Sequence, residues 1–466
     1  MGLKSNANYG AKSQLLSHCS RAFRTYDSLL DARNGVGAIR TQTVVVVDAN
    51  VLLMSAPSEL STLDEYVNLV FRFVEQAMGT GWLTVLVYDE PAAMTTAKRA
   101  EQAKRDAAKK LVVCSEDIDP FPFQDDYSAS DLEACTCILG VRDKRPCRSR
   151  LYDEISRRLL DRCKEKCDKW NASGKEENFT VVVFDGVDTR GCDRPAGESR
   201  DVRVQGTDDE VASLFARHVP IGEGDIKLQD VEDKVRQLVD GGKEDAGIAT
   251  LPASARLFRR TNLVVHSTVD TDSLMISCIA VSKRRLCAPL KTSLHSVLCM
   301  RSPPPRHEPG AQASYLTIDI AMLEACVLEH LFGRGAVVDP QVALHSMLAL
   351  AASTALSGCD FVHASGARFD HFFHCVGEFA RAEPHALKTF SRVLTASNAS
   401  EVRDAASGLT RLCVHASMNV EQKGRRYAKQ AKQIAEVDAQ SVMKAVWTAA
   451  YWSQNEIPTT DAEFGF

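Results

Sequence analysis

The sequence lacks the features that mark membrane and secreted proteins. No run of 18 apolar residues is long enough for a membrane-spanning helix, and the N-terminus has no apolar signal-peptide core. The 15 cysteines are odd in number and lack the spacing of a disulfide framework or a zinc site. We therefore expect an intracellular protein, cytoplasmic or nuclear, with reduced thiols and no membrane partner.

Nucleotide-binding loops are also missing from the sequence. No GxxxxGK[ST] phosphate-binding loop occurs, and Gly35-Val36-Gly37 precedes an expected strand instead of following one. We find no internal repeat. The sequence therefore gives no support to the use of ATP or NAD.

The chain does not carry the strong positive charge of many nucleic-acid-binding proteins. Its formal net charge is −5 over 466 residues. Its basic residues nevertheless cluster in four segments, at 98–110, 142–169, 283–285 and 423–432. Each cluster is as typical of a solvated helix face as of a phosphate-binding surface. Charge alone therefore leaves a nucleic-acid partner open.

Continuous apolar runs are present, and they predict buried parallel strands. We expect strands at 43–48, 83–88, 179–184, 263–269 and 274–281. Periodicity and composition predict helices at 11–33, 63–78, 95–111, 150–169 and 226–239. Segments 115–133 and 186–206 are expected to be loops. The alternation predicts an α/β fold, with a central, mostly parallel sheet flanked by helices.

The expected domain organisation follows from changes in this pattern. Residues 1–300 are expected to form an α/β domain with insertions at 115–149, 186–206 and 240–260. Residues 301–314 are rich in proline and are expected to form an exposed insertion. Residues 315–466 are expected to be mostly helical and to complete the functional site with Asp360.

Acidic residues follow several of the expected strands or lie in short glycine-containing segments. The set consists of Asp48, Asp89, Glu223, Asp225, Asp270, Asp272 and Asp360. Sites in open α/β sheets lie at the carboxyl ends of the strands, so these side chains are expected to converge. Crowded carboxylates need cations, and hard oxygen ligands suit Mg²⁺ or Mn²⁺. We expect two ions, which could hold the attacking and leaving oxygens of a phosphodiester.

In this order, the acidic segments resemble motifs of the Xrn family of 5′→3′ exoribonucleases, within the wider group of flap nucleases. The matching segments are Met1-Gly2, Val47-Asp48-Ala49-Asn50, Tyr88-Asp89, Ile221-Gly222-Glu223-Gly224-Asp225-Ile226-Lys227, Val269-Asp270-Thr271-Asp272, Gly358-Cys359-Asp360-Phe361 and the Trp- and Tyr-containing segment 446–458. The resemblance covers nearly the whole chain. It implies a PIN-like or flap-nuclease-like fold in which all seven acidic residues hold the metals, directly or through water.

The helix expected at 95–111 carries the most specific part of the resemblance. Lys98, Gln102 and Arg105 fall at i, i+4 and i+7, so they share one helical face. In the Xrn family, residues of these types at this spacing bind the 5′-monophosphate of the substrate. A terminal phosphate carries more charge than an internal one, and these side chains supply converging donors. The alternative is an ordinary charged helix.

The resemblance therefore implies a metal-dependent 5′→3′ exoribonuclease that degrades single-stranded RNA from a 5′-monophosphate end, with DNA as an alternative substrate. Two other functions stay open: a flap-type structure-specific DNA endonuclease, and a catalytically inactive scaffold or RNA-binding subunit. Glu244 and Asp245 are rivals of Glu223 and Asp225 as metal ligands. Flap-type relatives place their acidic helix nearer to the motif that contains Asp270.

Overall fold

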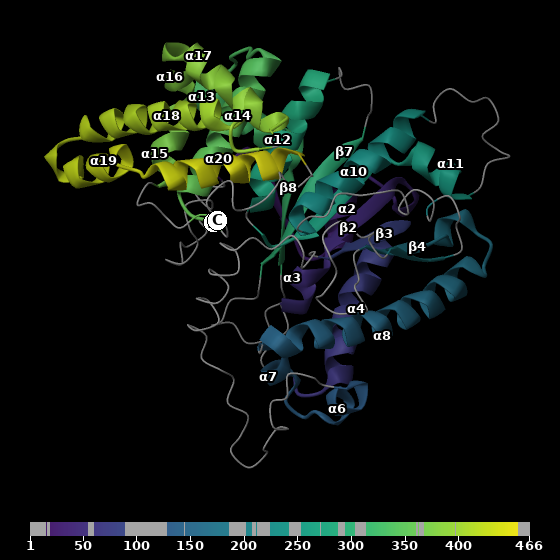
Figure 1. Cartoon of the computed structure of the whole chain (residues 1–466). Helices are drawn as coiled ribbons and strands as arrows, with labels where there is room; N and C mark the ends of the chain where they lie inside the picture. The colour runs from purple at the N-terminus through teal and green to yellow at the C-terminus, as the bar shows by residue number, and fades with distance from the viewer. Residues whose placement is uncertain are drawn as a thin grey trace.

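The computed structural model shows helices packed on both faces of one sheet, with further helices on one side (Figure 1). It describes residues 15, 19–54, 60–88, 128–143, 145–185, 202–206, 211, 224–241, 253–270, 272–287, 294–302, 314–359, 362, 368–396 and 398–454. All structural statements below refer to these residues.

The sheet has eight strands in the order β1-β8-β7-β6-β2-β3-β4-β5. Its strands are β1 Phe23–Tyr26, β2 Thr43–Asp48, β3 Leu83–Val87, β4 Val181–Asp185, β5 Val202–Gln205, β6 Leu263–Thr268, β7 His295–Ser302 and β8 Ser314–Asp319. Strands β7, β6, β2, β3 and β4 are parallel neighbours, whereas β1, β8 and β5 pair antiparallel at the two edges. An α/β fold with a mostly parallel sheet is therefore confirmed.

The helices of the sheet region precede β8 in the chain. They are α2 Leu29–Gly35, α3 Ala49–Met54, α4 Leu63–Thr80, α6 Ala129–Ala134, α7 Ile138–Asp143, α8 Arg145–Asn171, α10 Gly224–Gly241, α11 Ala253–Arg260 and α12 Asp272–Cys287. The same region contains the short 3₁₀ helices η1 Ser20–Ala22, η2 Arg40–Gln42 and η4 Glu176–Asn178. The expected helices at 63–78, 150–169 and 226–239 are thus confirmed as α4, α8 and α10.

Two layers of helices cover the sheet, and they explain the continuous apolar strands. In β2, Val45 and Val47 pack in the cluster of α2, α4 and α8, whereas Val44 and Val46 pack in the cluster of α10 and α11. All four valines are buried. A strand covered on both faces needs apolar residues at every position, which is the pattern of the sequence.

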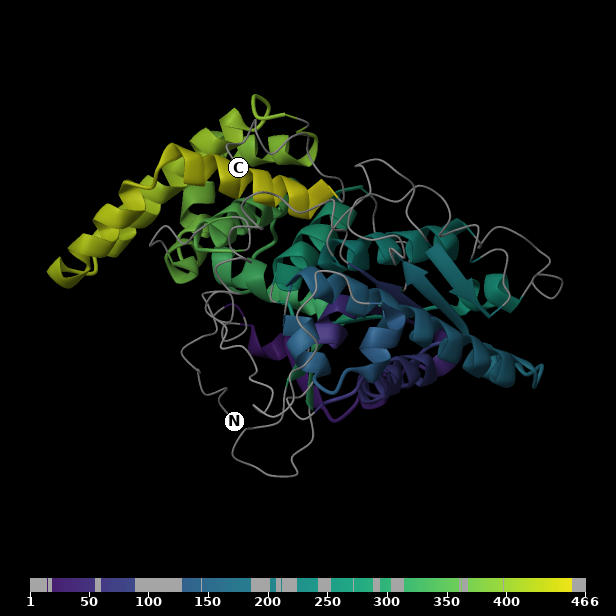
Figure 2. The ribbon, with the colours of Figure 1, turned by 60° about the horizontal axis from the view of Figure 1, so that its bottom comes forward.

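The chain after β8 is helical, as expected. Its elements are α13 Ile320–Phe332, α14 Pro340–Leu356, α15 Phe369–Phe373, α16 Val376–Ala382, α17 Pro384–Lys388, η7 Thr389–Leu394, α18 Arg403–Glu421, η8 Arg425–Tyr427, α19 Ala428–Ala435 and α20 Ala439–Gln454. Every residue of α14 from Ala343 to Leu356 is buried, so this helix forms the centre of the group. Figure 2 shows α18–α20 projecting on the side of the molecule opposite to α11.

Several predictions of local structure were wrong. The apolar run at 274–281 belongs to helix α12, and residues 23–26 of the expected first helix form strand β1. Residues 202–205 of the expected loop form edge strand β5, and 129–133 of another expected loop lie in α6. Arg301, Ser302 and Ser314 of the expected insertion end β7 and begin β8. The helix expected at 95–111 and the rest of the insertion lie outside the described residues.

The cysteines and the helices bear on two further expectations. Ten cysteines of the described part of the chain are free thiols, but Cys137 is disulfide-bonded, so the expectation of reduced thiols fails there.

Among the described helices, none has both the length and the apolar character needed to cross a membrane.

Candidate active site

Asp48 ends β2, the strand at which the order of the strands in the sheet changes direction along the chain. From β2 the chain continues to β3 and β4 on one side, and it returns to β6 and β7 on the other side. Asp48 is the last residue of β2 and is 5% exposed. In open α/β sheets, ligands bind at the carboxyl ends of the strands next to such a switch point. The position of Asp48 is therefore the first structural argument for a site here.

The loop after β6 brings a second acidic group to the same place. Thr268 ends β6, and its hydroxyl donates a 3.4 Å hydrogen bond to Asp48 Oδ2. The same hydroxyl oxygen accepts a 3.1 Å bond from the backbone N–H of Asp270. The Asp270 carboxylate in turn accepts a 3.0 Å bond from the backbone N–H of Asp272, which begins α12. One threonine thus links the end of β2 to the segment that carries Asp270 and Asp272.

Helix α10 places Asp225 at the same end of the sheet. Asp225 lies in the first turn of α10 and is 6% exposed. Two residues later, the side chain of Lys227 is fully buried, and its Nζ donates a 2.5 Å hydrogen bond to the carbonyl oxygen of Tyr88. Tyr88 directly follows β3. The first turn of α10 therefore lies over the carboxyl end of β3.

Four of the seven predicted acidic residues are in the described part of the chain, and all four lie at this end of the sheet. Asp48 and Asp272 are buried and Asp270 is exposed. The other predicted residues lie outside the described part: Asp89, Glu223, Asp360, Lys98, Gln102 and Arg105, together with the rivals Glu244 and Asp245. Their predicted roles, and the choice between the two acidic pairs, stay predictions.

The described residues do not by themselves form a complete metal-binding group. Within them, no three His, Cys, Asp or Glu side chains are placed so that they could hold one ion. The available donors are nevertheless the right type, because Asp48, Asp225, Asp270 and Asp272 offer carboxylate oxygens, which Mg²⁺ and Mn²⁺ prefer. The donor chemistry therefore fits a hard divalent cation.

A buried ionic network lies beneath the candidate site and joins α10 to β6. Glu232 on α10 is fully buried; its carboxylate lies 2.7 Å from Nε2 of His266 on β6 and accepts hydrogen bonds from Arg236 and Arg284. Ser296 on β7 donates a further bond of 2.6 Å. Burial alone would raise the pKa of Glu232, but the neighbouring Arg284, His266 and Arg236 hold that pKa well below its usual 4.5.

This network fixes the relative position of the two elements that carry the carboxylates. Glu232 lies about two helical turns after Asp225 on α10, and His266 lies four positions before Asp270 in the chain. Sequence reasoning missed Glu232, His266, Thr268 and the role of Lys227. Only Lys227 gave a signal, since it lies within the segment that resembles the family motif.

Several side chains from two of the four basic clusters form contacts within the protein. In the cluster at 142–169, Arg158 forms ion pairs with Glu154, Asp64 and Glu133. In the cluster at 283–285, Arg284 forms ion pairs with Glu232 and Asp233. Arg285 forms an ion pair with Glu324, and Lys283 donates a hydrogen bond to the carbonyl oxygen of Ser453. These side chains tie helices together, so they give less support to nucleic-acid binding than the sequence suggested.

The comparisons with known proteins give no family for this chain. A scan against protein-family models finds no match, and a search of curated proteins finds none either. The function of the site must therefore be argued from its position, its donors and its neighbours.

Proposed function

We propose that the protein is a divalent-metal-dependent nuclease that hydrolyses RNA in the 5′→3′ direction from a 5′-monophosphate end. The observation that carries the proposal is the gathering of Asp48, Asp225, Asp270 and Asp272 at the carboxyl ends of β2, β3 and β6. This is the end of an α/β sheet where ligands bind, at the switch in strand order.

The roles of the chain's own residues follow from their contacts. Asp48, Asp225, Asp270 and Asp272 would hold Mg²⁺ or Mn²⁺. When bound, such ions would neutralise charge on the phosphodiester and lower the pKa of a water. Thr268 orients the Asp48 carboxylate and the Asp270 backbone together. Lys227 holds the first turn of α10, and with it Asp225, against the end of β3.

The finer parts of the proposal come from the sequence resemblance. A PIN-like or flap-nuclease-like fold is compatible with the parallel strands β7-β6-β2-β3-β4. RNA as the substrate, and the preference for a 5′-monophosphate, depend on the resemblance and on Lys98, Gln102 and Arg105. A protein that reads phosphates rather than base edges should show little sequence specificity.

A comparison of three substrates tests the proposal directly. RNA with a 5′-monophosphate, RNA with a 5′-hydroxyl and a flapped DNA are incubated with the protein in Mg²⁺ and in EDTA. We expect cleavage only with Mg²⁺, fastest on the 5′-monophosphate RNA. Fastest cleavage of the flapped DNA would support the flap endonuclease instead, and no cleavage of any substrate would support the scaffold.

Variants of the carboxylates test whether this site does the chemistry. Asp48→Asn and Asp270→Asn should each lower kcat about 100-fold or more, because several kcal/mol of charge stabilisation depend on the ions. Asp404→Asn, a change of an exposed aspartate in α18, is the matched control and should keep wild-type activity.

A second readout of the same variants does not depend on turnover. Mg²⁺ should raise the Tm of the wild-type protein, because a ligand that binds only the folded state stabilises it. This rise should be lost in Asp48→Asn. Full activity in both carboxylate variants would place the active site elsewhere.

A further inference from the structure

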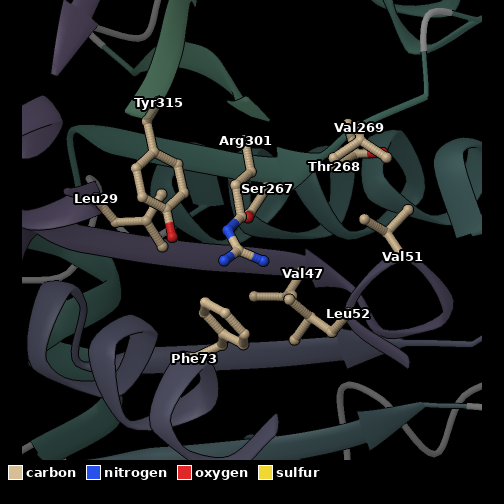
Figure 3. A pocket seen from close by; sticks show the side chains of 10 residues that line it. All are labelled: Leu29, Val47, Val51, Leu52, Phe73, Ser267, Thr268, Val269, Arg301 and Tyr315. Carbon is tan, nitrogen blue, oxygen red and sulfur yellow. The ribbon is translucent and has the colours of Figure 1, made fainter. Parts of the chain in front are cut away.

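Arg301 lies at the same end of the sheet as the candidate carboxylates. It is the penultimate residue of β7, one position beyond the pair of Thr268 on β6 with Met300 on β7. Its guanidinium carbon lies 4.1 Å from the ring centroid of Phe73 on α4, a cation–π distance (Figure 3). The side chain is partly buried, so a positive charge is held against apolar surface.

This charge lacks the partner that a buried arginine usually has. Among the residues that the structure describes, no carboxylate lies within ion-pair distance of Arg301, and its buried Nε has no hydrogen-bond acceptor. Burial lowers the pKa of the Arg301 guanidinium, and the nearby Tyr315 offsets part of the effect. Holding an arginine without an anion costs folding free energy, and one cation–π contact offsets only part of this cost.

The surroundings of the guanidinium form a small, mixed pocket. Leu29, Val47 and Leu52 line it with apolar atoms. Ser267 and Tyr315 also line it, and Figure 3 shows their hydroxyl groups near the Arg301 side chain. The cavity measures about 10 Å³, which is room for one water-sized group. It can therefore take one oxygen atom of a larger anion, and the remainder of that anion would lie at the mouth.

The pocket shares one lining residue with the candidate active site. Thr268 lines the pocket and also donates the hydrogen bond to Asp48. An anion held by Arg301 would thus lie in a pocket that contacts the candidate site through Thr268. Arginine suits phosphate oxygens particularly well, because its planar fork supplies several donors.

We propose that Arg301, with the hydroxyls of Ser267 and Tyr315, forms a subsite for one phosphate oxygen of the substrate. The inference deepens the proposed function and rests on it for the source of the phosphate. Binding of a phosphate at Arg301 does not itself require hydrolysis. A backbone phosphate of single-stranded RNA and the phosphate of a free nucleotide share this chemistry, and the experiment distinguishes them.

Binding is measured in EDTA, so that metal-dependent cleavage plays no part. Fluorescence anisotropy gives the Kd for a short single-stranded RNA, and the shift in Tm reports binding of inorganic phosphate and of adenosine 5′-monophosphate. Arg301→Met should weaken RNA binding about tenfold or more, as expected for the loss of a charge-assisted hydrogen bond. Arg334→Met removes an exposed arginine and is the matched control; it should leave the Kd unchanged.

The Tm of Arg301→Met and the binding of two further variants, Arg301→Lys and Tyr315→Phe, separate a binding role from a structural one. Arg301→Met should keep or raise the Tm of the free protein, because methionine can pack on Phe73 without a buried charge. Arg301→Lys keeps the charge but loses the fork, so it should restore part of the binding. Tyr315→Phe removes only one hydroxyl and should weaken binding severalfold.

The outcomes distinguish this proposal from the proposed function. Wild-type affinity in Arg301→Met would overturn the subsite, even if cleavage depends on Asp48. RNA binding that depends on Arg301, without any cleavage in Mg²⁺, would support the subsite and contradict the nuclease. A Tm shift with phosphate or the nucleotide, without RNA binding, would support the subsite and assign it to a free phosphate compound.

Discussion

At the scale of single residues, one fully buried charge has several charged neighbours. Glu232 is fully buried, and it is surrounded by His266, Arg236 and Arg284. Such a cluster contributes little net stability compared with an apolar core, but removing one member leaves the other charges uncompensated. Because the cluster joins α10 to β6, its integrity matters for the position of the candidate carboxylates.

The network gives a prediction about stability and its dependence on pH. Glu232→Gln should lower the free energy of unfolding by about 3–5 kcal/mol near neutral pH, because two arginines lose their shared anion. The folded-state pKa of Glu232 is well below the usual 4.5. The stability that the ionised Glu232 contributes is therefore fully present above about pH 4.5, and it is lost as the pH falls through the folded-state pKa. The stability difference from wild type should therefore narrow below about pH 4.5.

Urea denaturation at neutral pH and at about pH 4 measures this difference. Glu421→Gln is the matched control, since Glu421 is an exposed glutamate at the end of α18, and it should change stability little at either pH. A Glu232→Gln difference that stays constant with pH would contradict the ionised state of Glu232.

At the scale of elements, close backbone approach decides how the C-terminal helices pack. Gly377 in α16 lies against the end of α13, where an added Cβ would be 1.7 Å from the carbonyl oxygen of Leu331. Any larger residue must push the two helices apart. The glycine is therefore required by the contact between two helices and not by its own backbone dihedral angles.

Gly377→Ala should destabilise the protein by about 3 kcal/mol through overpacking. Gly79→Ala in α4 is a matched control, because an added Cβ there meets nothing within 4 Å. That change should stabilise the protein by about 0.5–1 kcal/mol, since alanine favours a helix over glycine. Thermal unfolding of both variants measures the contrast, and equal effects would contradict the close approach.

The β7–β8 hairpin contains a histidine whose charge depends on pH. His295 Nε2 lies 3.2 Å from Asp319 Oδ2, and this hydrogen bond raises the pKa of His295 above its usual 6.5. The stability that the pair contributes is present below pH 6.5 and is lost as the pH rises through the folded-state pKa. Both side chains are more than a third exposed, so the effect should not exceed about 1 kcal/mol.

Asp319→Asn tests this pair while keeping the N-cap of α13, because asparagine caps a helix as well as aspartate does. The stability lost in Asp319→Asn should be larger at about pH 6 than at about pH 8.5. Asp438→Asn changes another aspartate whose carboxylate accepts a backbone hydrogen bond, at Ser441, and should show no such difference. A larger stability loss in Asp319→Asn at about pH 8.5 than at about pH 6 would refute the role of His295.

At the scale of the whole molecule, the core is continuous from the sheet to the C-terminal helices. On β7, Val297 and Cys299 pack with the layer of α4 and α8, whereas Leu298 and Met300 pack in the cluster that extends to α14 and α20. A single strand is thus shared between both parts. The domain boundary predicted near residue 315 stays a prediction, but β8 itself belongs to the sheet.

A shared core should open as one unit. In hydrogen exchange measured by mass spectrometry, peptides from β2 and from α14 should show the same opening free energy, equal to that of global unfolding. Exposed helix α19 serves as the reference for local opening and should exchange faster. A difference of more than about 1.4 kcal/mol between β2 and α14, a factor of ten in exchange, would show that the two parts unfold separately.

The central strands and the clearly amphipathic helices could be predicted from the local residue pattern. The β-branched valines of β2 favour a buried strand between two layers, and α4 begins at a capping box formed by Thr62 and Glu65. Acidic residues at strand ends were likewise sufficient to place Asp48 and Asp270 at one end of the sheet, because parallel strands end together.

Elements with an ambiguous local pattern depend on contacts with distant parts of the chain. Residues 274–281 are apolar on every side because α12 is buried between the sheet and the C-terminal helices, and such a run has no period that separates helix from strand. The antiparallel strands β1, β5 and β8 form through hydrogen bonds to strands elsewhere in the chain. The same reason applies to the Thr268 link and to the Arg301 pocket: both depend on side chains that are adjacent only after the chain has folded.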